Sequence, residues 1–126
     1  MLGVVALPAV LLALAPFHSS IEPLPRPVKT QLKERGFWHQ GCPVPLSDLR
    51  LLTVSHRGFR GRTRTGQLVV NKSAARPLAR VFRKLYRLHF PIRHMGLDDA
   101  YGPRRDRPRD GDVSGSFECR EAVPSP

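Results

Sequence analysis

The stretch LRLLTVSHRGFRGRTRTGQLVVNKSAARPLARVFRKLYRLHF, residues 49–90, decides the fold because its hydrophobic period changes part of the way along. In residues 48–56 and again in residues 63–71, apolar side chains alternate with others and share one face: Leu52, Val54, Leu68 and Val70. A period of two is typical of strands, and the glycines between the two runs favour a turn. The sequence therefore predicts an antiparallel hairpin over residues 49–71.

After this hairpin the apolar period lengthens to that of a helix. Apolar side chains recur three and four positions apart, at Leu78, Val81, Phe82, Leu85 and Tyr86. Basic residues fill the other face, and Pro91 ends the run because the residue before a proline is pushed out of the helical region. We expect an amphipathic helix over residues 74–89, with Ser73 as its N-cap and Pro77 in its first turn.

The segments that follow complete the predicted domain. Residues 92–97 are typical of a short strand, residues 102–115 form a loop rich in Arg, Asp, Pro and Gly, and residues 115–120 are typical of a last strand. Strands interrupted by a helix indicate an α+β fold. We expect a small antiparallel sheet packed by one amphipathic helix.

The first forty residues are predicted to lie outside this domain. Residues 1–18 are almost wholly apolar and uncharged, which is typical of the hydrophobic part of a secretion signal, although a buried helix or an uncleaved anchor would have the same composition. A secreted or cell-envelope location follows from the first interpretation. Residues 19–40 are expected to be a Pro-rich linker, because prolines at alternate positions disfavour helix interiors and sheet ladders.

The net charge of +11 indicates anionic partners, because Lys and Arg number 21 against 10 acidic residues. The loop over residues 56–64 combines Arg, Gly and Phe, a composition typical of RNA-binding segments, but it occurs once and lies inside the predicted hairpin. The alternative to a specific anionic partner is a basic surface that a secreted protein tolerates among anionic wall polymers. Nucleic acid is the less favoured partner.

No set of metal ligands or catalytic residues is recognisable in the sequence. The five histidines lack the spacing of a zinc motif. Arginines interrupt the aspartates of residues 98–112, whereas a calcium loop needs oxygens at fixed alternate positions and a terminal Glu. Surface or packing roles are expected for both groups.

The two cysteines, Cys42 and Cys119, are candidates for a disulfide. In an exported chain such a bond would close a long loop and stabilise the fold by about 4 kcal/mol on the chain-entropy model. Two buried free thiols, or a Cys119 with a partner elsewhere, are equally compatible with the sequence.

Five segments, in order along the chain, resemble one protein family: GCPVPLSDLRLL at 41–52, TGQLVVN at 65–71, VFRKLY at 81–86, FPIR at 90–93 and SFECR at 116–120. Together they resemble the N-terminal half of bacterial zinc peptidases of the D-alanyl-D-alanine carboxypeptidase type, a group that includes phage L-alanyl-D-glutamate endopeptidases. The resemblance implies that residues 41–120 are the N-terminal half of a peptidase-like domain, followed by a tail at residues 121–126.

The resemblance also implies a function. The family uses Zn²⁺ to hydrolyse bonds of D-amino acids in peptidoglycan stem peptides, and an arginine matching Arg120 holds a substrate carboxylate. The zinc motif Ser-x-His-x-x-Gly-x-Ala-x-Asp is absent from these 126 residues. We therefore expect a truncated member that binds no zinc and is inactive alone. The alternative is a non-catalytic secreted basic protein that binds anionic wall polymer or nucleic acid.

Overall fold

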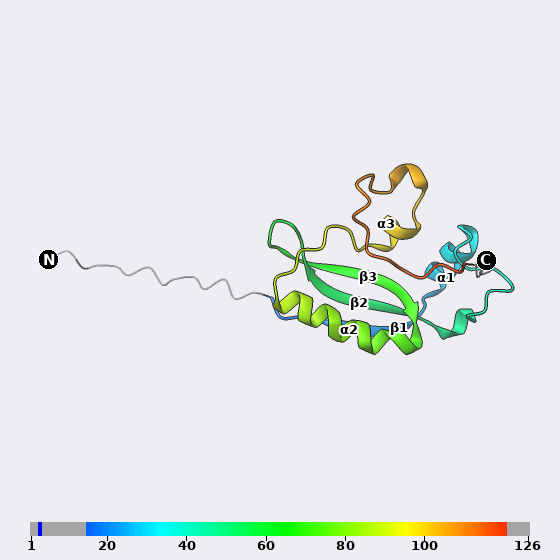
Figure 1. The fold of residues 1–126 in the computed structure, drawn as a ribbon, viewed down its shortest axis with the longest axis horizontal. Coiled ribbons are helices and arrows are strands. Elements are labelled where there is room, and N and C mark those ends of the chain that lie inside the picture. The colour runs from blue at the N-terminus through cyan, green and yellow to red at the C-terminus, as the bar shows by residue number, and fades with distance from the viewer. Residues whose placement is uncertain (1–2, 4–14, 121–126) are drawn as a thin grey trace, which may run out of the picture.

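The computed structural model describes residue 3 and residues 15–120, so the predicted leader lies mostly outside the described residues and the predicted tail wholly so. Its elements are, in chain order, β1 (Ser19–Pro23), α1 (Arg26–Glu34), the 3-10 helix η1 (Leu46–Asp48), β2 (Leu49–Arg57), β3 (Thr63–Asn71), α2 (Lys72–Arg87), α3 (Leu97–Tyr101) and the 3-10 helix η2 (Arg104–Asp106) (Figure 1). A three-stranded antiparallel sheet with helices packed on it confirms the predicted α+β class.

The predicted hairpin is present and forms the centre of the sheet. Strands β2 and β3 pair over their whole length, from Leu49 opposite Asn71 to Arg57 opposite Thr63. The turn between them is closed by a hydrogen bond of 2.9 Å from the Gly58 N–H to the Arg62 carbonyl.

The prediction of a linker over residues 19–40 is wrong. Strand β1 pairs antiparallel with β2, and α1 follows it directly. The prolines are accommodated because each occupies a position where a missing N–H costs little: Pro23 ends an edge strand, Pro25 is the N-cap of α1, and Pro27 lies in the first turn of α1.

The sheet is covered on both faces by separate hydrophobic clusters. Successive strand residues point to opposite faces, so Leu49 and Leu51 face one way and Leu52 and Val54 the other. The first cluster joins the sheet to α1 and α3 through Leu24, Val28, Leu32, Leu49, Leu51, Val69 and Tyr101. The second joins it to α2 through Leu52, Val54, Leu68, Val70, Ala75 and Met95.

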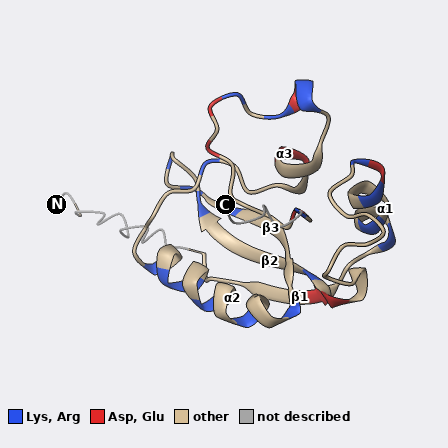
Figure 2. Ribbon diagram, turned by 45° about the vertical axis from the view of Figure 1, so that its right-hand side comes forward, with Lys and Arg blue, Asp and Glu red and all other residues tan. Residues whose placement is uncertain are grey.

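Helix α2 differs from the prediction in its cap, in the place of Pro77 and in the exposure of Val81. Asn71 is the N-cap, and its side-chain oxygen accepts a hydrogen bond from the Ser73 N–H. Pro77 lies inside the helix, beyond the first turn, and Val81 is 50% exposed. Leu78 and Phe82 of the predicted stripe pack on the second cluster, and they are joined there by Ala75 and Ala79. Six basic and no acidic residues belong to this helix, and they line its outer side (Figure 2).

The strands predicted over residues 92–97 and 115–120 are absent, although both segments lie along the free edge of β3. The Gln67 N–H donates to the Met95 carbonyl, and the Phe117 N–H donates to the Val69 carbonyl, each over 2.8 Å. These contacts with β3 are single hydrogen bonds, and the isolated bridges nearby join Arg57 to Pro91 and His94 to Val113, so no ladder forms. The Met95 side chain lies directly against the Gly66 backbone, and a Cβ at position 66 would overlap the Met95 side chain.

No helix in residues 15–120 is long and apolar enough to cross a membrane.

Candidate substrate-binding cleft

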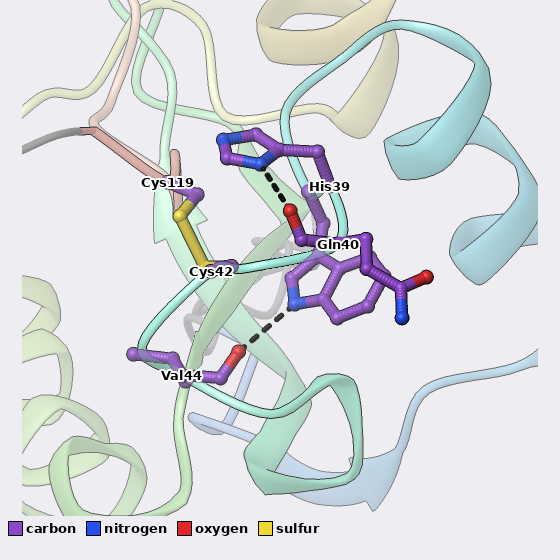
Figure 3. Close-up of a disulfide and its surroundings, with 6 residues drawn as sticks. His39, Gln40, Cys42, Val44 and Cys119 are labelled. Atoms are coloured by element: carbon purple, nitrogen blue, oxygen red, sulfur yellow. Dashed lines mark hydrogen bonds between the residues drawn. A yellow bond between two sulfur atoms is a disulfide. The ribbon is translucent and has the colours of Figure 1, made fainter.

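A disulfide between Cys42 and Cys119 joins the connection after α1 to the end of the described chain (Figure 3). The two Cα atoms lie 6.0 Å apart, and the Cys119 N–H donates to the Phe37 carbonyl over 2.8 Å. The Trp38 indole N–H donates to the Val44 carbonyl over 2.9 Å and closes the loop that carries Cys42. The sequence left open a disulfide, two free thiols, or another partner for Cys119; in the structure the two cysteines are paired with each other. The crosslink holds residues 117–120 against the first hydrophobic cluster.

Tyr101 anchors the same segment from the other side. Its ring is 1% exposed and packs edge-on against Phe37, with ring centroids 4.7 Å apart. Its hydroxyl donates to the Phe117 carbonyl over 2.6 Å and lies 2.8 Å from Ser116 Oγ. Ser116 Oγ also accepts from the Val69 N–H over 2.8 Å. Burial raises the pKa of Tyr101 to about 12, so the phenol stays a hydrogen-bond donor at neutral pH.

These contacts leave a cleft of about 360 Å³ between the loop after α3 and residues 114–120. Arg107 lies on one side, with its Nε donating to the Gly102 carbonyl over 2.8 Å and its guanidinium 5.4 Å from the centre of the Phe37 ring. Arg120 lines the cleft from the other segment. The cleft is therefore lined by Arg107 and Arg120 together with Asp99 and Glu118, on a frame held by a disulfide and a buried tyrosine.

Arg120, the residue predicted to hold a substrate carboxylate, is exposed to solvent and forms an ion pair with Glu118. Its side chain is 79% exposed, and its Nη2 lies 3.0 Å from Glu118 Oε2. An exposed pair of this kind contributes little to stability and exchanges readily with another anion.

The histidines and aspartates are not gathered into a metal site in the part of the chain that the structure describes: residues 15–120 contain no cluster of three His, Cys, Asp or Glu side chains with metal-binding geometry. His94 Nε2 lies 3.0 Å from Asp110 Oδ2, and Arg93 Nε lies 3.2 Å from Asp112 Oδ2. The Asp112 N–H first, and then His94, hold the pKa of Asp110 below its usual value. These pairs tie the loop after α3 to the segment before it.

Sequence reasoning missed Tyr101, Ser116 and His56. Tyr101 and Ser116 are separated by a loop without periodicity, so no pattern connected them. His56 was treated as one of five dispersed histidines, but it is 4% exposed and its Nδ1 has no hydrogen-bond partner among the described residues. The available signal was its place on the even-numbered face of β2, the face that carries Leu52 and Val54.

Comparison of the chain with protein-family models, with curated proteins and with solved structures finds no match.

Proposed function

We propose that the chain is the substrate-binding part of a peptidoglycan-directed zinc peptidase of the D-alanyl-D-alanine carboxypeptidase type, in which Arg120 receives the terminal carboxylate of a stem peptide. The proposal rests on the resemblance of the five ordered segments, and one structural observation supports it: Arg120 lines a cleft that the Cys42–Cys119 disulfide holds in place. A guanidinium fork is suited to bidentate contact with a carboxylate.

The chemistry of the proposed family requires Zn²⁺, which polarises the peptide carbonyl and activates water. The motif that supplies the zinc ligands does not occur in these 126 residues. Binding without hydrolysis is therefore the activity that we propose for this chain, with an envelope location. Incubation with peptidoglycan and added Zn²⁺ is expected to release no D-alanine, and turnover would contradict the proposal.

Peptide binding tests the role of Arg120 directly. A peptide ending in D-alanyl-D-alanine is titrated into the 126-residue chain beside the same peptide with an amidated C-terminus. The acid is expected to bind about tenfold more tightly, because a charge-assisted hydrogen bond contributes about 1.5 kcal/mol. Arg120→Ala should remove this preference.

Arg104→Ala provides the matched control, because it removes the same charge from the nearby 3-10 helix without changing the lining of the cleft. Equal affinity for the acid and the amide, or an equal loss in both variants, would contradict the proposal.

A further inference from the structure

A second cavity lies at the end of the hairpin and is lined mainly by arginines. It measures about 400 Å³, and its lining includes Phe59, Arg60, Arg62, Thr63, Arg64 and Arg93. It shares no lining residue with the cleft that contains Arg120. We call it the hairpin cavity. A volume of this size suits a small organic ligand rather than a bare inorganic ion.

The hairpin cavity has a strong excess of positive charge. Four of the residues that line it are arginines, and none is acidic. Within residues 15–120 the ion pairs of these arginines are confined to Arg93, which lies 3.2 Å from Asp112 and 3.9 Å from Asp110. Like charges that line one cavity repel one another, and an anion placed between them offsets that repulsion.

Contacts with neighbouring residues position two of the arginines, Arg64 and Arg93. The Arg93 guanidinium lies 4.1 Å from the centre of the Phe59 ring, which fixes both side chains. Gly58 leaves room for the stem of Arg64, since a Cβ at position 58 would lie 3.0 Å from Arg64 Cδ. Phe59 remains 58% exposed and offers apolar surface beside the charges.

A smaller polar cavity of about 150 Å³ adjoins this site and shares Arg64 and Arg93 with it. His56 and Asp99 line the smaller cavity, and the buried Nδ1 of His56 has no hydrogen-bond partner among the described residues. A buried nitrogen without a partner is costly, and a ligand oxygen within reach would remove the cost. The unpartnered nitrogen of His56 is thus a second observation, independent of the charge, and it lies in the cavity that shares Arg64 and Arg93 with the hairpin cavity.

We infer that the hairpin cavity binds the phosphate group of a phosphate ester, with Arg62 and Arg64 as guanidinium donors and the organic part of the ester against Phe59. A phosphate carries up to two negative charges and several acceptor oxygens, which match more than one guanidinium fork at once. A carboxylate offers two oxygens and one charge, and so leaves most of these donors unmatched. The site is separate from the proposed peptide-binding cleft and does not depend on it.

Calorimetric titration of the full chain tests the inference with three probes at one ionic strength: inorganic phosphate, phenyl phosphate and poly(glycerol phosphate). Phenyl phosphate is expected to bind several-fold more tightly than inorganic phosphate through its contact with Phe59, and Phe59→Ala should remove the difference. Binding of phenyl phosphate assigns the site to small monoesters, and binding of the polymer alone assigns it to phosphodiesters.

Two double variants that remove the same charge distinguish phosphate binding at the hairpin cavity from attraction by the net charge of the protein. Arg62→Gln/Arg64→Gln should weaken phosphate binding at least tenfold, because two charge-assisted contacts are lost. Arg76→Gln/Arg80→Gln removes the same charge from the exposed side of α2 and should change the affinity less than twofold. Gly58→Ala, which displaces the stem of Arg64, should weaken binding several-fold.

A spectroscopic readout at His56 completes the test. Phosphate should raise the pKa of the His56 imidazole, measured by NMR, because a nearby negative charge favours the imidazolium form. The exposed His39 serves as reference, and Arg120→Ala should leave the response intact. Equal weakening by both double variants, no binding of any probe, or an unresponsive His56 would overturn the inference.

Discussion

The Tyr101 hydroxyl shows how one polar atom positions the candidate cleft. It connects α3 to residues 116 and 117, and those residues lie along the edge of β3. Tyr101→Phe keeps the ring and its packing on Phe37 but leaves the Phe117 carbonyl without this donor. We expect the free energy of unfolding to fall by about 1 kcal/mol, measured by urea denaturation.

The control for that variant is Tyr86→Phe, which also removes a hydroxyl from a buried aromatic ring; the lost partners there are Thr63 and Ala15. Only Tyr101→Phe should also loosen the cleft, seen as faster amide hydrogen exchange at residues 116–119. Unchanged exchange at these amides would show that the hydroxyl does not hold the segment.

His56 gives the stability a dependence on pH. Burial lowers the pKa of His56 below its ordinary value of 6.5, and the Arg64 charge lowers it further, against the opposing effect of nearby carbonyl groups. The unfolded chain therefore binds this proton more readily than the folded chain, so stability is lost as the pH falls from 6.5 towards the folded-state pKa.

We expect the free energy of unfolding to decrease between pH 7 and pH 5, and His56→Gln to flatten this dependence. The measurement is urea denaturation at a series of pH values. Asp110 acts in a separate, more acidic window, because its lowered pKa makes its contribution disappear only below its ordinary value of 3.8. An identical slope in the wild type and in His56→Gln would exclude His56 as the source.

Individual site residues differed in how visible they were in the sequence. Cys42, Cys119 and Arg120 could be selected because cysteines are few and because Arg120 ends a segment that resembles a known motif. Tyr101 and His56 could not, since hydrogen bonding and burial depend on tertiary contacts that no local pattern encodes. The clustering of arginines around Phe59 required the position of Arg93, which is remote from the hairpin loop in sequence.

At the scale of elements, α2 packs through Leu78 and Phe82 of the predicted stripe and buries Tyr86, but Val81 is exposed. The choice of Val81 as a buried residue assumed that every apolar side chain shares one stripe. In the structure the stripe passes through Ala75 and Ala79, whose small side chains let the helix approach the sheet. The linker predicted over residues 19–40 was wrong for a related reason. The free-energy cost of a proline in β1 or α1 depends on its position within the element rather than on the number of prolines.

This assignment of faces predicts different costs for two neighbouring truncations in α2. Phe82→Ala removes a ring packed on the second cluster and should lower the free energy of unfolding by about 2 kcal/mol. Val81→Ala removes an exposed side chain and should change it by less than about 0.5 kcal/mol. Thermal or urea denaturation measures both, and comparable losses would show that the helix is rotated from the orientation described.

At the scale of the whole molecule, the disulfide is the principal constraint on the unfolded chain. It joins residues 77 positions apart. Cys42→Ser/Cys119→Ser should therefore lower the free energy of unfolding by about 4 kcal/mol on the chain-entropy model, measured by denaturation of the two proteins in parallel. The reduced wild type should match the double variant.

The reduced protein and the serine variant should retain the hairpin, because the β2–β3 pairing and the second cluster contain neither cysteine. Loss of the β-sheet signal in circular dichroism at low denaturant would show instead that the sheet depends on the crosslink.

The α+β class could be predicted from the hydrophobic periods of residues 49–90. The crosslink and the covering of both faces of the sheet could not, because they depend on segments that have no clear period.

The same crosslink has a consequence for cleavage of the backbone. The exposed loop after α3 contains Arg104, Arg105 and Arg109, so trypsin has several targets there. Every one of them lies between Cys42 and Cys119, and a cut chain would still be one covalent molecule. Its two pieces would migrate as a single band on a gel until a reducing agent was added. A molecule nicked in this loop would thus keep both walls of the Arg120 cleft attached to each other.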